Sequence, residues 1–151
     1  MIQRVQSIYL LVASIFMLLF YVFPIAVFTT STFAFEFFNC HITHPENLEP
    51  PITLAPLAIL PLLSILISFV TIFLFKKRKI QMRLSKINLL LIFTIIVVTI
   101  LYFLKISELL DGDVQYGFSG IFPILAFIVT IMAHSAINKD EELVRSADRI
   151  R

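Results

Sequence analysis

The chain has 151 residues, of which 59% are hydrophobic and 15% charged, and its mean hydropathy is +0.96. A soluble domain has about 45–50% apolar and about 25% charged residues, and a chain of this size has too little interior to bury the excess. These values exclude a soluble globular protein, a disordered chain and a coiled coil, and they leave a helical membrane protein. Because the formal net charge is only +2, the placement of the charges is more informative than their sum.

Four apolar runs without Asp, Glu, Lys or Arg follow one another along the chain, at residues 7–29, 52–75, 87–104 and 120–138. Each is 18 residues or longer, and about 20 helical residues cross a hydrocarbon core of about 30 Å. The sequence therefore predicts an all-α membrane protein, a single integral membrane domain over residues 1–151 with four transmembrane helices in an up-down bundle. The connections are loops at 30–51 and 105–119, a linker at 76–86 and a tail at 139–151.

Alternating apolar side chains occur in both longer loops, namely Phe33, Phe35 and Phe37 in the first and Val114, Tyr116 and Phe118 in the second. A period of two residues is typical of a half-buried strand. The two segments are therefore expected either to pair as a short hairpin or small sheet on the bundle, or to place their aromatic rings in the headgroup layer.

The first loop also contains Cys40, His41, His44 and Glu46 within seven residues. A thiolate, imidazoles and a carboxylate are ligands of soft divalent metals, but this spacing matches no standard zinc pattern. Since Cys40 is the only cysteine, a disulfide within the chain is excluded. We expect a solvated loop, with no metal and no cofactor.

The polar residues inside the runs follow helical spacing. Ser64, Ser68 and Thr71 are at i, i+4 and i+7 and so share one helix face, while Asn88 and His134 lie in the third and fourth runs. Small and hydroxylated side chains let membrane helices approach and hydrogen-bond, so we predict that these five residues are buried. A polar conduit is the alternative. For His134, a hydrogen bond to Asn88 or to a carbonyl is expected, and a proton-linked or metal-linked role is the alternative.

The charges distinguish the two ends of the predicted bundle. The linker 76–86 has six basic residues and no acidic one, whereas Lys105 is the only basic residue in the two longer loops. Eleven of the 12 basic residues therefore fall on one side. By the positive-inside rule this side is cytoplasmic, so the sequence predicts that both termini are cytoplasmic.

Four of the linker cations, Lys76, Lys79, Arg83 and Lys86, recur at helical spacing. They are expected either to contact anionic lipid headgroups or only to set the topology. The tail 139–151 is predicted to be a helix with an apolar stripe, folded against the cytoplasmic end of the bundle. Its arginines, Arg145, Arg149 and Arg151, then remain available for a partner protein or anionic lipid.

Three segments of the chain are the basis of a resemblance: residues 1–10 (MIQRVQSIYL), 79–84 (KIQMRL) and 139–149 (KDEELVRSADR). With these segments the sequence resembles an uncharacterised family of small four-span bacterial membrane proteins, a domain of unknown function in Gram-negative bacteria. The resemblance implies the same topology in the bacterial inner (cytoplasmic) membrane and assigns no catalytic residue.

No catalytic Ser-His-Asp order, glycine-rich phosphate loop or H-E-x-x-H motif occurs in the sequence. We therefore predict a non-catalytic interaction, assembly or accessory subunit that contacts another membrane or cytoplasmic protein through its cytoplasmic face. No nucleic-acid partner is expected. The alternative is a small oligomeric transporter or channel, in which Ser64, Ser68 and Thr71 would line a pore between copies. A membrane enzyme is less favoured.

Overall fold

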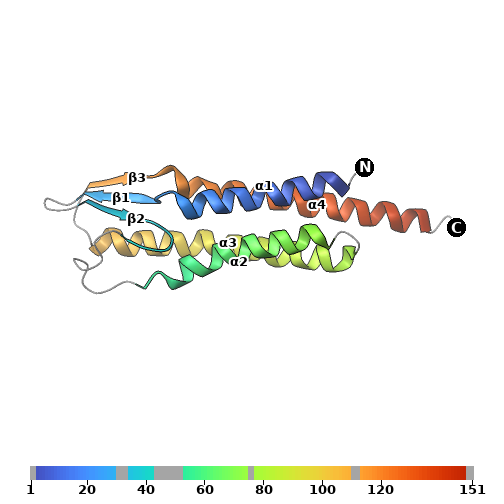
Figure 1. Ribbon diagram of the computed structural model, residues 1–151, viewed down its shortest axis with the longest axis horizontal. Helices are drawn as coiled ribbons and strands as arrows, with labels where there is room; N and C mark the ends of the chain where they lie inside the picture. The colour runs from blue at the N-terminus through green and yellow to red at the C-terminus, as the bar shows by residue number, and fades with distance from the viewer. Residues whose placement is uncertain (1–2, 30–33, 43–52, 75–76, 110–112, 149–151) are drawn as a thin grey trace.

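The computed structural model describes residues 3–29, 34–42, 53–74, 77–109 and 113–148, and four long helices dominate them (Figure 1). The helices are α1 (Gln3–Val22), α2 (Ala55–Phe73), α3 (Arg78–Leu109) and α4 (Phe122–Asp148). Each of the four is long and apolar enough to cross a membrane. The prediction of four long apolar helices is therefore confirmed.

The four helices form a closed ring in which α1 packs against α2 and α4, and α3 packs against the same two helices. Neighbouring helices run in opposite directions, so α1 begins, α2 ends, α3 begins and α4 ends on one side of the molecule (Figure 1). We call this side the terminal end. The opposite side, which has a small β-sheet, is the sheet end.

The sheet consists of three antiparallel strands in the order β2-β1-β3, with β1 at Ala26–Thr29, β2 at Ala34–Phe37 and β3 at Asp113–Tyr116. Phe28 of β1 is opposite Phe35 on one side and Val114 on the other. Both loop segments with alternating residues thus contain strands, but they pair with β1 and not with each other. Phe118 lies in the 3-10 helix η2 (Phe118–Ile121) that precedes α4, and Phe33 lies outside the described residues.

The first apolar run was predicted to be helical to residue 29, and this prediction is wrong. α1 stops at Val22, and the last four residues of the run form β1. Pro24 explains the break, because proline has no backbone N–H and disfavours helical conformation in the residue before it. The apolar residues that follow Pro24 belong to the sheet, in which Ala26 and Phe28 are buried.

Two helices also extend beyond their predicted spans. Residues 78–86, expected in a separate linker, and residues 105–109, expected in a loop, belong to α3, and residues 139–148 of the predicted tail continue α4 without interruption. Lys, Arg, Glu and Leu have high helix propensity, so both helices extend beyond their apolar runs into segments rich in these residues.

The interior changes in character along the bundle. Large apolar side chains fill the half near the sheet, whereas small or polar side chains dominate the half near the terminal end. The first group includes Met17, Phe20, Phe28, Phe37, Ile92, Ile95 and Ile106, and the second Ala13, Ser14, Ser68, Thr71, Ser85, Thr130 and Ala133. Small residues allow close helix approach. Large apolar side chains also cover the outside, as Phe73 (73% exposed) and Leu90 (69% exposed) illustrate.

Candidate functional site

A buried hydrogen-bonded group, the serine–asparagine cluster of Ser64, Ser68 and Asn88, joins α2 to α3. The Ser64 hydroxyl donates to Oδ1 of Asn88 over 2.8 Å, and Nδ2 of Asn88 donates to the Ser68 hydroxyl over 2.9 Å. All three residues are at most 1% exposed. A single carboxamide thus bridges two residues one turn apart on the facing helix. In proteins whose helices do span a membrane, hydrogen bonds of this kind contribute about 0.6 kcal/mol on average.

Thr71 and Ser85 extend this polar region toward the terminal end. Thr71 is buried and donates its hydroxyl to the carbonyl of Ile67 in its own helix, over 2.6 Å. The hydroxyl of Ser85 is also buried and has no partner among the described residues. Because the predicted stripe of Ser64, Ser68 and Thr71 lies inside one chain, these side chains do not face a neighbouring copy. They are therefore not placed to line a pore between copies.

His134, the fifth residue predicted to be buried, is only half-buried on α4 and has no hydrogen bond to the serine–asparagine cluster. Its Nε2 lies 3.2 Å from Nδ2 of Asn138, one turn further along the same helix. The Asn88 side chain bonds to the two serines, and the buried Nδ1 of His134 has no partner among the described residues. The hydrogen bond expected for His134, to Asn88 or to a carbonyl, is therefore not formed within that part of the chain.

The cysteine–histidine loop places only two of its four residues within the described part of the chain. Cys40 and His41 are exposed, with Sγ of the first 3.1 Å from Nδ1 of the second. His44 and Glu46 lie outside that part. Among the residues that the structure describes, no three His, Cys, Asp or Glu side chains are grouped so as to hold a metal ion.

The terminal end has a second polar group, the Asp140 anchor, formed by Asp140, Gln6 and Arg78. The side-chain amide of Gln6 donates to the carboxylate of Asp140 and to the carbonyl of Ala136, the latter over 3.2 Å. Arg78 donates from Nη1 to the backbone carbonyl of Asp140 over 3.4 Å. Asp140 is only 7% exposed, so α1, α3 and α4 are tied together at this point.

The Asp140 anchor was not predicted from the sequence. Gln6 and Asp140 are 134 positions apart, and each lies within two residues of the end of an apolar run, where a polar residue is ordinarily solvated. The only available signal was spacing, because Asp140 follows Ala126, Thr130, Ala133 and Ile137 at helical intervals on one face of α4. That face packs against α1, which places the carboxylate next to Gln6.

Beyond the Asp140 anchor, α4 extends past the ends of the other three helices (Figure 1). We call residues 141–148 the projecting segment. The predicted tail helix folded against the bundle is therefore wrong. The segment continues α4 in the same direction, since no Gly or Pro interrupts it, and Leu143 is 49% exposed. The side chain of Arg145, and the whole of Arg149 and Arg151, lie outside the described residues.

The exposed cations of the terminal end lie mainly on the first turns of α3. Lys79, Arg83 and Lys86 are exposed there, and Lys77 and Lys139 are exposed nearby. Lys76, the fourth predicted cation, lies outside the described residues. At the sheet end, Lys105 is the single exposed cation in the part of the chain that the structure describes.

The fold and these sites define a class of protein: a four-helix bundle with membrane-length apolar helices, a small sheet at one end and cations at the other. The chain belongs to the family described as Domain of unknown function (DUF4293), whose model matches residues 2–150. The resemblance to an uncharacterised family is thereby confirmed. No curated protein matches the chain.

Proposed function

We propose that this protein is a multi-pass protein of the bacterial cytoplasmic membrane, with its terminal end in the cytoplasm. Two features support this proposal. Four apolar helices of membrane length expose large side chains such as Phe73 and Leu90. Soluble monomers rarely expose large contiguous apolar surfaces to water. The exposed cations gather at the terminal end, as the positive-inside rule requires of a cytoplasmic side.

We further propose that the protein is a non-catalytic accessory subunit that binds another membrane or cytoplasmic protein at its terminal end. The observation that carries this proposal is the projecting segment of α4. A helix that continues beyond its bundle places Leu143 away from the core, whereas Asp140 one turn earlier is buried and bonded. The cations of α3 beside it suit anionic headgroups, each attracted by about 1 kcal/mol near the membrane surface.

The orientation is tested by cysteine labelling in intact cells with a membrane-impermeant maleimide. Cys40 lies at the sheet end and is exposed, so it should react from outside. A Lys77→Cys variant in a Cys40→Ser background places its thiol at the terminal end and should react only after the cells are permeabilised. Labelling of both thiols from the same side would contradict the proposed topology.

The partner site is tested with two truncated chains, one that keeps the Asp140 anchor and one that removes it. A chain ending at Glu142 retains Asp140, so it should fold with unchanged stability but lose its stoichiometric co-purifying protein. A chain ending at Asn138 also removes the carboxylate from Gln6. Because hydrogen bonds to charged groups contribute about 1.5–3 kcal/mol, this shorter chain should also melt at a lower temperature.

Two charge variants then locate the contact. Replacing Arg145, Arg149 and Arg151 together with alanine tests the tail, and replacing Lys79, Arg83 and Lys86 tests α3. We expect the tail variant to lose the protein partner, and the α3 variant to retain it while losing affinity for vesicles with anionic lipid. A partner retained by the tail variant and by the chain ending at Glu142 would refute the terminal-end site.

A further inference from the structure

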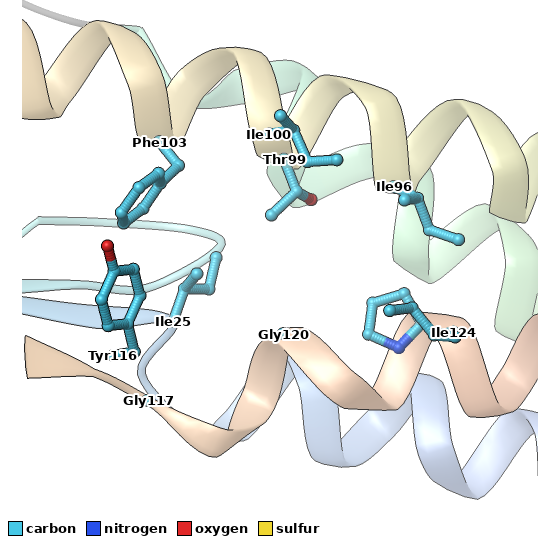
Figure 2. A pocket seen from close by; sticks show the side chains of 10 residues that line it. Ile25, Ile96, Thr99, Ile100, Phe103, Tyr116, Gly117, Gly120 and Ile124 are labelled. Carbon is cyan, nitrogen blue, oxygen red and sulfur yellow. The ribbon is translucent and has the colours of Figure 1, made fainter.

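The sheet end contains a cavity of about 210 Å³ between α3, the start of α4 and the beginning of β1 (Figure 2). Thr99, Ile100 and Phe103 line it from α3, and Tyr116, Gly120 and Ile124 line it from β3, η2 and α4. In Figure 2 the rings of Phe103 and Tyr116 face each other at the end toward the sheet. Their centroids are 5.7 Å apart.

The chemistry of the wall excludes a polar ligand. Its side chains contribute only two polar atoms, the hydroxyls of Thr99 and Tyr116. The Thr99 hydroxyl already donates to the carbonyl of Ile95 over 2.7 Å, and Tyr116 is 79% exposed at the rim. A buried water needs two to four polar partners, which this wall does not supply. The cavity therefore suits hydrocarbon.

The size and position of the cavity indicate which hydrocarbon. An engineered cavity of about 150 Å³ lined by apolar side chains holds benzene, so this larger cavity has room for a stretch of alkyl chain. Its mouth is flanked by Ile100 and Ile124, which are 52% and 49% exposed on helices of membrane length. An acyl chain already in the bilayer can enter the cavity laterally, between the helices, and make the dispersion contacts that an empty cavity lacks.

We infer that this cavity binds one acyl chain of a phospholipid in the outer leaflet. The inference rests on the proposed membrane insertion and orientation but concerns the opposite end from the proposed partner site. Thr99, only 8% exposed, and the partly buried Phe103 should contact lipid more persistently than Leu101 and Leu104, which are 60% and 56% exposed.

The test uses the full chain in lipid nanodiscs containing a phospholipid with a photoactivatable diazirine in one acyl chain. After irradiation, the labelled residues are mapped by mass spectrometry. We expect stronger labelling at Thr99 and Phe103 than at Leu101 and Leu104. Labelling that simply follows exposure, strongest at Leu101 and weakest at Thr99, would mean ordinary contact with bulk lipid and would overturn the site.

Two cavity-filling variants and a matched control complete the test. Thr99→Phe and Gly120→Leu should each lower labelling of Phe103 several-fold, because the new side chains take the space of the acyl chain. Thr94→Phe makes the same change as the first variant elsewhere on α3, at a half-buried threonine bonded to its own helix. It should leave the labelling pattern unchanged. Equal labelling of Phe103 in all three variants would overturn the site.

A further sample distinguishes a phospholipid from a free fatty acid as the source of the acyl chain. The labelling pattern also distinguishes failure of the cavity site from failure of the proposed membrane insertion. A free fatty acid with the same diazirine is added in a parallel sample, and cavity labelling by the fatty acid but not by the phospholipid would overturn the assignment to phospholipid. If the phospholipid labels neither Leu101 nor Leu104, membrane insertion itself fails. If it labels these two residues but not Thr99 and Phe103, only the cavity site fails.

Discussion

Replacing Gly117 with alanine should destabilise the protein by about 2–4 kcal/mol, one of the two largest effects that we expect from a single substitution. A Cβ at this position would lie 2.5 Å from the carbonyl oxygen of Pro24 and 2.8 Å from that of Ile25. Both are backbone atoms, so they cannot rotate away as a side chain can. The chain must therefore separate β3 from the segment that leads into β1.

That separation removes two hydrogen bonds at the sheet end. The Gly117 N–H donates to the Ile25 carbonyl over 2.9 Å, and the Ser119 hydroxyl donates to the Pro24 carbonyl over 2.8 Å. Thermal unfolding in detergent, followed by circular dichroism, measures the loss. Gly120→Ala is the matched control, because a Cβ there meets nothing within 4 Å. A Gly117 variant as stable as this control would show that the sheet end tolerates rearrangement.

Replacing Ser68 with leucine should have a comparable effect, about 2–4 kcal/mol, for a different reason. Ser68 is 1% exposed, and overfilling a packed site costs about 1–3 kcal/mol. The substitution also removes the acceptor of the Asn88 amide, and hydrogen bonds between membrane helices contribute about 0.6 kcal/mol on average, up to about 1.7. The bundle is therefore expected to loosen where α2 meets α3.

Phe73→Leu is the control for this prediction, because Phe73 is on the same helix but 73% exposed. We expect its melting temperature in detergent to stay close to that of the unchanged chain, while that of Ser68→Leu falls clearly. If the two variants melt alike, the serine–asparagine cluster does not stabilise the bundle.

Much of the architecture could be predicted from the sequence because it depends on local pattern. Long apolar runs favour helices, because a helix satisfies its own backbone hydrogen bonds, and helical spacing placed Ser64, Ser68 and Thr71 on one face. The structure buries all three of these residues. Alternation likewise indicated the strands at Phe35 and Tyr116, since a two-residue period is a property of the strand itself.

The serine–asparagine cluster and the Asp140 anchor were less predictable, because their contacts join residues far apart in the chain. Asn88 is visible in the sequence as a polar residue in an apolar run, but nothing local assigns it to Ser64 and Ser68 instead of His134. Gln6 and Asp140 meet only because α1 packs against α4. Such pairings depend on the rotation and relative height of whole helices, which composition does not encode.

Residue type and period alone predict the number and the apolar character of the helices and the side on which the cations gather. Two further features depend on contacts between distant segments. Residues 26–29 lie between β2 and β3 as the central strand, and a cavity remains beside Gly120. The cause is the same for both. An apolar side chain is buried equally well by a helix, a sheet or a lipid chain, and only the packing of distant segments decides among them.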